Sequence, residues 1–330
     1  LQRSFSLGTL RTLIANAAGI FVALIGLARF KPQMVVATGG YVCFPVVVAA
    51  RILRMLRIVR ARIALLEINV TPGLTSRLLT PLVDEVWTTY AASERSFGAK
   101  TVVTGAPVRA SLRIAKDAAS ARERLELDPE RTTVVAMGGS QGARSINEAV
   151  AALVTRRTLG DGWQVLHVSG ARDYGYMQAE ERTLAAGNQV RLVPYLDDPA
   201  DAYAAADVVI ARAGASTLAE LAVTGTPAIL IPYPHAADRH QAHNAELFAA
   251  AGAAVVLPDA EVDGDRLWWT LREVLEPDRN AALRRAVRAL APRNAAAAIA
   301  DRIDAAVFGH ADAPDVARVS AVSDANEDAP

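Results

Sequence analysis

The chain has 330 residues, with 35 basic and 35 acidic side chains and therefore no formal net charge at pH 7. This length exceeds one ordinary α/β core and predicts two domains of roughly 100–150 residues each, with a cleft between them. A neutral chain with only 5% aromatic residues lacks the positive field and the stacking surface that nucleic acid needs, so we expect no nucleic-acid partner. The single cysteine, Cys43, excludes an internal disulfide and fits the reducing cytoplasm.

The first long apolar segment covers residues 12–28 and is flanked by Arg11 and Arg29. A segment of this kind is a membrane span, a signal-peptide core or an apolar helix. It is slightly short for a span, contains Asn16 and two glycines, and runs directly into a strand predicted at 34–37. We therefore expect a buried helix.

Strand-like apolar runs alternate with helical segments over residues 34–103 and again over 133–257. This alternation is typical of doubly wound α/β domains with parallel sheets. We predict an N-terminal domain at 1–114, a charged helical linker at 115–131, a C-terminal domain at 132–308 and a disordered tail at 309–330. The first domain does not open with a strand and a glycine-rich turn, so we expect those elements to be missing from this sequence.

Four arginines, Arg51, Arg54, Arg57 and Arg60, recur every three residues among aliphatic side chains. In a helix this spacing produces a basic amphipathic face. Such a face suits an anionic membrane, and it also fits a solvated helix beside the sheet.

The segment at 207–211 is short and β-branched, which predicts a strand buried on both faces of a parallel sheet. A turn at Gly214 and a helix start follow it. This geometry directs the first-turn N–H groups and the positive end of the helix dipole to the carboxyl edge of the sheet, where a diphosphate is stabilised. Thr217 and Glu220 are also spaced as a capping box, in which Glu220 would only bond the backbone at the cap.

Two further glycine turns follow predicted strands, at residues 38–42 and 138–144. One such turn is weak evidence for a ligand, because tight strand-to-helix crossings need glycine whatever they bind. The joint occurrence of three turns with the segments that follow them is more specific.

Two groups of residues invite a metal hypothesis. Asp197 and Asp198 precede a helical segment, where aspartate is a normal cap. His235, His240 and His243 lie in a segment whose polar neighbours suit sugar binding better than zinc. We therefore expect no metal and no cofactor.

Taken together, these segments resemble the MurG family of glycosyltransferases over residues 31 to about 303. The resemblance implies a GT-B fold, in which two Rossmann-like domains face a cleft. It also implies inverting transfer of N-acetylglucosamine from UDP-N-acetylglucosamine to lipid I, which yields lipid II for peptidoglycan. It rests on seven ordered blocks: Gly39-Gly40-Tyr41-Val42; Glu67-Ile68-Asn69 with Pro72-Gly73-Leu74-Thr75; Pro107-Val108-Arg109; 138–143; Tyr195-Leu196-Asp197-Asp198; 212–220; and Pro234-His235 with Gln241 and Asn244-Ala245-Glu246.

The resemblance implies a donor site in which the loop at 138–141 and the helix start at 213–217 hold the diphosphate and sugar. Backbone groups at Leu196 would contact the uracil edge, and Glu220 would bind the ribose hydroxyls. The side-chain amides near 241–244 suit sugar hydroxyls, since each offers a donor and an acceptor. The implied donor-binding residues are Arg109, Gly139, Ser140, Gln141, Leu196, Gly214, Ala215, Ser216, Thr217, Glu220, Gln241 and Asn244.

On the acceptor side, the reaction needs a base for the attacking hydroxyl. In the family an N-terminal loop with a histidine faces the acceptor, and no segment of this sequence corresponds to it. The chain also has Leu66 and Ile68 where the family has histidine and glutamine. Glu67 between them is the predicted catalytic base, a role that requires apolar neighbours to raise its pKa. The implied acceptor-side residues are Gly40, Tyr41 and Asn69.

The implied partners are UDP-N-acetylglucosamine, a lipid-linked acceptor and an anionic membrane contacted peripherally at the cytoplasmic face of the cell membrane. Helix dipoles and Arg109 can stabilise the leaving diphosphate without a metal ion. Two alternatives stay open: a related UDP-sugar transferase or epimerase with the same donor pocket, and a donor-binding chain without activity.

Overall fold

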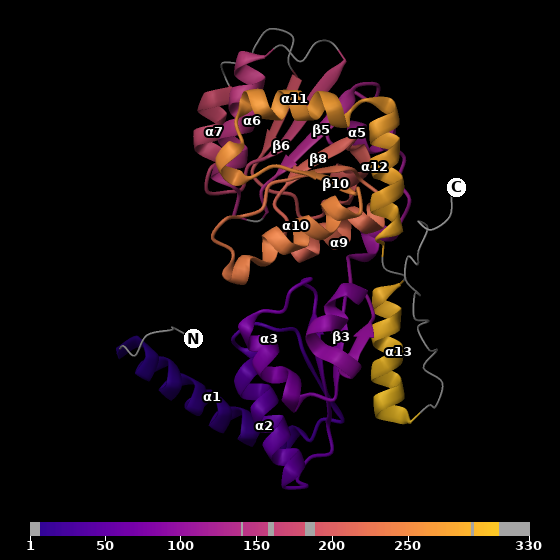
Figure 1. Ribbon diagram of the computed structural model, residues 1–330. Coiled ribbons are helices and arrows are strands. Elements are labelled where there is room, and N and C mark those ends of the chain that lie inside the picture. The colour runs from indigo at the N-terminus through magenta and orange to yellow at the C-terminus, as the bar shows by residue number, and fades with distance from the viewer. Residues whose placement is uncertain (1–6, 140, 158–161, 182–188, 292–293, 310–330) are drawn as a thin grey trace, which may run out of the picture.

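The computed structural model describes residues 7–139, 141–157, 162–181, 189–291 and 294–309. Figure 1 shows two α/β domains, with the N-terminal domain below the C-terminal one. Apart from Gly309, the tail predicted at 309–330 lies outside the described residues.

The described strands of the N-terminal domain form one parallel sheet in the order β1-β2-β3-β4. Alternate side chains of β2 point to opposite faces: Ile63 and Leu65 pack with α2, whereas Ala64 and Leu66 pack in a cluster with Trp87. The strands are β1 (Met34–Ala37), β2 (Arg62–Glu67), β3 (Glu85–Thr88) and β4 (Thr101–Val103), and the helices are α1 (Leu7–Phe30), α2 (Cys43–Met55), α3 (Leu74–Leu79) and α4 (Glu94–Phe97).

The described strands of the C-terminal domain form a second parallel sheet in the order β10-β9-β8-β5-β6-β7. The chain runs outward from β5 through β6 and β7 and then returns to place β8 against the other side of β5. The carboxyl ends of β5 and β8 are therefore the topological switch point, where open α/β sheets bind their ligands. The strands are β5 (Thr132–Met137), β6 (Trp163–Val168), β7 (Gln189–Val193), β8 (Val208–Ala211), β9 (Ala228–Leu230) and β10 (Ala254–Val256).

Helices cover both faces of this second sheet, which explains the uninterrupted apolar strands; Val135 and Val209 face one core cluster, whereas Val134 and Ile210 face another. The helices of this domain are α5 (Ala118–Arg124), α6 (Arg144–Arg156), α7 (Tyr174–Glu181), α8 (Ala200–Ala205), α9 (Ala215–Thr224), α10 (His240–Ala250), α11 (Gly264–Val274) and α12 (Pro277–Ala289), and they are followed by α13 (Ala295–Phe308), which packs on the N-terminal domain.

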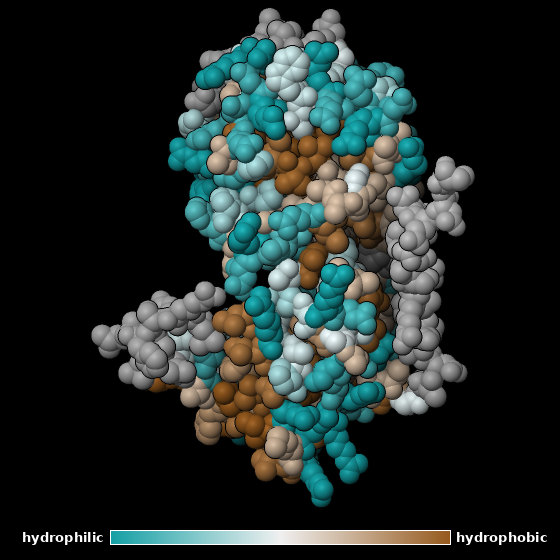
Figure 2. Space-filling view, viewed as in Figure 1, coloured by the Kyte–Doolittle hydropathy of each residue, from teal (hydrophilic) through white to brown (hydrophobic). Residues whose placement is uncertain are grey.

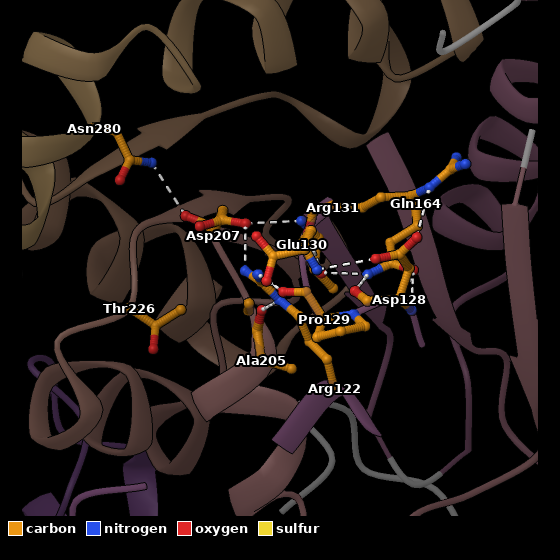
Figure 3. A network of polar contacts seen from close by, with 12 residues as sticks. Arg122, Asp128, Pro129, Glu130, Arg131, Gln164, Ala205, Asp207, Thr226 and Asn280 are labelled. Carbon is orange, nitrogen blue, oxygen red and sulfur yellow. Dashed lines mark hydrogen bonds and ion pairs between the residues drawn. The ribbon is translucent and has the colours of Figure 1, made fainter. Parts of the chain in front are cut away.

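Polar contacts anchor the segment predicted as the linker, 115–131, to the C-terminal domain (Figure 3). Arg122 on α5 lies 2.9 Å from the carboxylate of Asp207, which also accepts the Thr133 backbone N–H at 2.7 Å. Gln164 accepts the backbone N–H of Asp128 at 2.9 Å. The chain therefore passes between the domains before α5.

The last described helix, α13, returns to the N-terminal domain (Figure 1). Its Ile299 and Ile303 pack against the cluster around Trp87, and Arg302 pairs with Glu85 at 3.0 Å. Among the described residues, an apolar cluster and an ion pair thus connect α13 to the first sheet.

The expectation of a buried helix at residues 12–28 was wrong in one respect. α1 is helical, but among its described side chains none is buried, and Phe21 and Val22 are 64% and 69% exposed. The reason is that α1 packs mainly on α2, where Gly19 lies against Pro45. Within the described residues, no helix is both long and apolar enough to cross a membrane.

The predicted basic helix face at 51–60 is also wrong. α2 ends at Met55, and Arg57 adopts a left-handed conformation with φ of +58°. The Ile58 N–H bonds the Leu53 carbonyl at 2.9 Å and the Arg57 N–H bonds the Arg54 carbonyl at 3.0 Å, which is a Schellman stop. Arg54 meanwhile turns to Asp84, so these arginines share no helical face.

Candidate active site

The loop after β5 depends on glycines at a backbone contact. Gly142 has φ of +74°, and a Cβ there would lie 2.2 Å from the Ser169 carbonyl oxygen. A Cβ on Gly170 would lie 2.4 Å from the Gly142 nitrogen. The loops after β5 and β6 therefore touch through their backbones. This contact holds the predicted residues Gly139 and Gln141 ahead of α6 at the switch point, whereas Ser140 lies outside the described residues.

Two helices begin at the switch point, and the N-cap residue of each has no side-chain oxygen that could accept a hydrogen bond from the first turn. α6 begins after Ala143, and α9 begins after Gly214. The first-turn N–H groups of a helix have no partner within the helix, so each start offers donors and a positive dipole end to an anion. The predicted residues Ala215, Ser216 and Thr217 form the first turn of α9.

The capping-box alternative for Glu220 is wrong. The N-cap of α9 is Gly214 rather than Thr217, and one carboxylate oxygen of Glu220 accepts the hydroxyl of Tyr203 at 2.8 Å. Tyr203 is only 2% exposed. Burial raises the pKa of Glu220 above its usual range, although the Tyr203 hydroxyl and the charge of Arg109 act in the opposite direction. Within the described residues, the other carboxylate oxygen of Glu220 accepts no hydrogen bond and is available to another donor.

Three of the predicted donor-site residues meet on this side of the domain. Arg109 donates a hydrogen bond to the backbone carbonyl of Asp197, next to Leu196. The charge of Arg109 also acts on Glu220. The structure therefore brings together Arg109, the Leu196 loop and Glu220, which come from distant parts of the sequence.

The groups considered for metal binding have other partners. The N-cap of α8 is Pro199 rather than an aspartate, but Asp198 directly before it accepts the Ala200 backbone N–H of the first turn at 3.0 Å. His240 contacts the Ala237 carbonyl at 2.7 Å, and His243 contacts Glu246 at 3.2 Å. In the part of the chain that the structure describes, no group of three or more His, Cys, Asp or Glu residues could hold a metal ion.

The two amides implied for sugar binding differ in their surroundings. The side-chain oxygen of Gln241 accepts the Tyr233 backbone N–H at 2.9 Å, and its residue is half-buried. Asn244 is fully buried and bonds Asn69, Val70 and Ala213. Gln241 is the more exposed of the two amides, and sugar binding by both stays a prediction.

Glu67 lies at the end of β2 with only 5% exposure. One carboxylate oxygen accepts the backbone N–H and the side-chain amide of Asn69 at 3.0 and 2.9 Å. The other accepts the Ser76 hydroxyl at 2.6 Å. These bonds fix the loop between β2 and α3. A role for Glu67 as the base stays a prediction, and this geometry does not present its carboxylate to an acceptor.

The predicted acceptor-side loop precedes α2. Gly39 and Gly40 both have φ of +77°, and Tyr41 is 48% exposed. The Tyr41 hydroxyl accepts a hydrogen bond from the Asn16 amide at 2.7 Å, which ties this loop to α1. Leu66, where the family has histidine, lies in the cluster beneath α13.

Sequence reasoning missed Tyr203 and treated Arg212 only as part of a motif. Arg212 bonds the Ile231 carbonyl at 3.1 Å and the Ser145 hydroxyl at 2.9 Å, so it joins the end of β8 to α6. The only sequence signal for Tyr203 is that it is a lone tyrosine in an alanine-rich helix. This signal does not indicate that Glu220 is its partner.

Two parallel-sheet domains with helix starts at the switch point define the GT-B fold of glycosyltransferases and related UDP-sugar enzymes. Residues 133–303 match the glycosyltransferase family 28 C-terminal domain, and residues 1–88 match the corresponding N-terminal domain. The chain belongs to this family and, within it, to the MurG family. The predicted family and fold class are confirmed.

Curated relatives carry the name UDP-N-acetylglucosamine--N-acetylmuramyl-(pentapeptide) pyrophosphoryl-undecaprenol N-acetylglucosamine transferase. The protein from Desulforamulus reducens is 36% identical over 282 residues, which are 84% of this chain and 74% of that protein. The protein from Moorella thermoacetica is 42% identical over 269 residues, which are 80% of this chain and 71% of that protein.

Solved structures agree with this assignment. The crystal structure of MurG from Acinetobacter baumannii is similar with a TM-score of 0.72 at 25% identity, over 86% of this chain and 77% of that chain. UDP-GlcNAc 2-epimerase from Neisseria meningitidis, bound to UDP-GlcNAc, shares the fold with a TM-score of 0.61 at 12% identity, over 88% and 81% of the two chains.

Proposed function

We propose that this enzyme transfers N-acetylglucosamine from UDP-N-acetylglucosamine to N-acetylmuramyl-(pentapeptide) pyrophosphoryl-undecaprenol, converting lipid I to lipid II in peptidoglycan synthesis. One observation carries the proposal: the start of α9, which has no side-chain cap, lies at the switch point, and Glu220 on the same helix is close enough to Arg109 to feel its charge. It occurs in a chain whose relatives, at 36% and 42% identity, are named for this transfer.

The donor lies across the carboxyl ends of β5 and β8 in this proposal. Its diphosphate binds the helix starts of α6 and α9, where backbone donors and dipoles favour negative charge. The carboxylate oxygen of Glu220 that does not bond Tyr203 accepts a hydrogen bond from a ribose hydroxyl, and backbone groups at Leu196 bind the uracil base. The amide of Gln241 binds the sugar, together with the glycine loop that includes Gly139 and Gln141.

In the reaction, the acceptor hydroxyl oxygen forms a bond to the anomeric carbon while the bond from that carbon to the diphosphate oxygen breaks. The electron pair leaves with UDP, so negative charge grows on the diphosphate. Preorganised dipoles stabilise such charge without reorganising during the reaction. The helix starts and Arg109 supply this stabilisation, and the acceptor proton passes to a base on the opposite side of the sugar.

Peripheral membrane contact forms part of the same proposal, because a lipid-linked acceptor must be taken from a bilayer surface. α1 and the end of α2 expose several large apolar side chains, and Figure 2 shows hydrophobic surface over this part of the N-terminal domain. They are Ile14, Phe21, Val22, Phe30, Met55 and Leu56, each more than 60% exposed.

Exposed cations border this apolar surface, among them Arg29, Lys31 and Arg57. Apolar side chains with a basic rim bind the interface of anionic bilayers. The contact belongs at the cytoplasmic face of the cell membrane, which is the peripheral location that the family implies. The proposed membrane contact is therefore the apolar surface of α1 and not the basic helix face that the sequence predicted at residues 51–60.

The test measures donor binding and transfer with the same purified protein. Calorimetry compares UDP-N-acetylglucosamine with UDP-glucose, and a radiolabelled donor reports transfer to lipid I. We expect selective donor binding that weakens about tenfold or more in Glu220→Ala, since one charged hydrogen bond is lost. The exposed control Glu261→Ala should bind as the wild type does.

Two results would contradict the proposal and identify the alternatives. Conversion of free donor to its epimer without acceptor would indicate an epimerase. Tight and selective donor binding without transfer to lipid I would indicate a donor-binding chain that has no transferase activity.

A further inference from the structure

A fully buried histidine lies near the end of β6, one strand away from the switch point. The Nε2 of His167 is 3.0 Å from the side-chain oxygen of Asn147 on α6, which is itself buried. An amide oxygen only accepts hydrogen bonds, so Nε2 of His167 carries a hydrogen and donates it to Asn147. Neither side chain is among the donor contacts proposed above.

The amide nitrogen of Asn147 connects α6 to the loop after β6. It donates to the Ser169 backbone carbonyl at 2.9 Å and to the Asp173 carboxylate at 3.0 Å. The opposite orientation of the amide would place its oxygen against these two acceptors, so the contacts allow one orientation. Asn147 therefore uses its oxygen and both of its N–H groups on partners within the protein.

Asp173 ends this series and directly precedes α7. The hydrogen bond from Arg172 holds the pKa of Asp173 below its usual range, and the Asn147 amide and the charge of Arg144 act in the same direction, against the effect of burial. An ionised carboxylate is a strong acceptor. α6 and α7 lie side by side (Figure 1), so the series joins β6, α6 and the start of α7.

These contacts lie one turn from the start of α6. The Asn147 backbone N–H bonds the Ala143 carbonyl at 2.9 Å and so closes the first turn. The Ser169 carbonyl that Asn147 holds is also the group against which Gly142 packs. Apolar packing of α6 on the sheet is non-directional, whereas hydrogen bonds depend on distance and angle. The series therefore fixes the first turn against the loop after β6.

We propose that His167 and Asn147 are positioning residues for the donor diphosphate. Through Ser169 and Asp173 they fix the start of α6, and this sets where its first-turn N–H groups meet the phosphate oxygens. The inference rests on the proposed function, because that function places the diphosphate at this helix start. Neither side chain touches the donor, and their effect is on the phosphates rather than on the nucleoside.

The experiment compares variants that remove or keep the N–H at position 167. His167→Phe keeps a ring and removes the N–H, whereas His167→Gln keeps an amide N–H that can reach the Asn147 oxygen. Asn147→Leu removes the amide at similar volume and tests the same connection if His167→Phe folds poorly. Calorimetry measures Kd for UDP, and ligand-observed NMR measures Kd for uridine, which has no phosphate.

The matched control is Gln164→Leu, because Gln164 lies on the same strand three residues before His167 and is also fully buried. Its amide likewise makes three hydrogen bonds, with Thr133 and Asp128. These bonds lie at the opposite end of the sheet from the switch point. Gln164→Leu should therefore lower the Tm but leave the Kd for UDP within about threefold of the wild-type value.

We expect His167→Phe and Asn147→Leu to weaken UDP binding by about tenfold, which is the effect of one lost hydrogen bond to a charged group. The Kd for uridine should change less than about threefold. His167→Gln should bind UDP nearly as the wild type does. In the wild-type protein, nitrogen NMR should show that Nε2 of His167 is protonated, a readout that needs no variant.

Three outcomes would overturn the inference. The first is unchanged UDP affinity in folded His167→Phe and Asn147→Leu proteins. The second is an equal loss of UDP and uridine binding in these variants, which would indicate general loosening of the domain. The third is a His167 ring whose Nε2 carries no hydrogen. A wild-type protein that does not bind UDP would instead contradict the proposed function, so the two failures are distinguishable.

Discussion

Glu220 is a half-buried carboxylate that we propose governs donor binding. Its carboxylate is bonded to the hydroxyl of Tyr203, and burial raises its pKa. The nearby charge of Asp198 raises the pKa further, whereas Tyr203 and Arg109 lower it. A carboxylate that accepts ribose hydroxyls must be ionised, so donor affinity should fall as pH decreases through this pKa.

Replacement of Tyr203 by phenylalanine removes the stabilising hydroxyl and keeps the ring. The pKa of Glu220 then rises further, and the protonated form persists to higher pH. We expect the acidic limb of UDP-N-acetylglucosamine affinity to move to higher pH, with binding roughly fivefold weaker near neutrality. Calorimetry from mildly acidic to neutral pH measures this shift.

The matched control is Tyr90→Phe. The Tyr90 hydroxyl is buried and, within the described residues, has no hydrogen-bond partner. Its removal should leave the pH profile unchanged. Superimposable pH profiles for Tyr203→Phe and the wild type would show that the hydroxyl does not act through Glu220.

At the scale of elements, the loops that we propose bind phosphate depend on close backbone packing. The loops after β5 and β6 meet at Gly142 and Gly170, where added Cβ atoms would lie within 2.4 Å of backbone atoms. Backbone cannot give way as a flexible side chain does. These glycines therefore serve packing, and phosphate binding follows from the loop shape that the packing holds.

Substitution Gly142→Ala tests this contact. The strained φ of +74° and the clash with the Ser169 carbonyl should lower the free energy of unfolding by about 3 kcal/mol or more. Urea denaturation measures the change. Gly175→Ala in α7 has nothing within 4 Å and should instead stabilise the protein by about 0.5 to 1 kcal/mol; equal effects of the two substitutions would refute the packing argument.

The exposed surface of α1 makes a second prediction at this scale. The pair Phe21→Asp and Val22→Asp places charge in the apolar surface that is proposed to enter the bilayer. We expect at least about tenfold weaker cosedimentation with anionic vesicles. Trp269→Asp, at a 60% exposed site on α11, is the control, and unchanged binding by the α1 variant would eliminate α1 as the contact.

At the scale of the molecule, α13 ties the end of the described chain to the first domain. Ile299 and Ile303 belong to the cluster around Trp87, and Arg302 bonds Glu85. Bonds from Arg302 and Trp87 hold the pKa of Glu85 below its usual range, against the opposing effect of burial. The stability of the N-terminal sheet thus depends on a helix from the far end of the sequence.

Truncation of both isoleucines to alanine should loosen this attachment. Because the side chains are partly buried, we expect a loss of about 1 to 2 kcal/mol for each. Hydrogen exchange should accelerate in β2 and β3 and stay slow in β5 and β8. Uniform acceleration over both domains would show that α13 supports the whole molecule rather than the first sheet.

Much of the fold was predictable because its signals are local. The strands predicted at 34–37 and 207–211 correspond to β1 and β8 within one residue, since β-branched runs mark buried parallel strands. Glycine turns at the strand ends indicated the helix starts of the donor site, because a turn and the helix after it are adjacent in sequence.

Contacts between distant segments were not predictable in this way. Arg54 appeared to belong to a basic face until its pairing with Asp84 was visible, and Glu220 fitted a capping box until Tyr203 was placed beside it. Asn244 is a predicted sugar ligand, and only the structure shows that it also bonds Asn69 and Val70, which lie more than 170 residues away in the other domain. Sequence spacing reports neighbours along one element, whereas burial and long-range pairing arise only when the sheets and helices pack together.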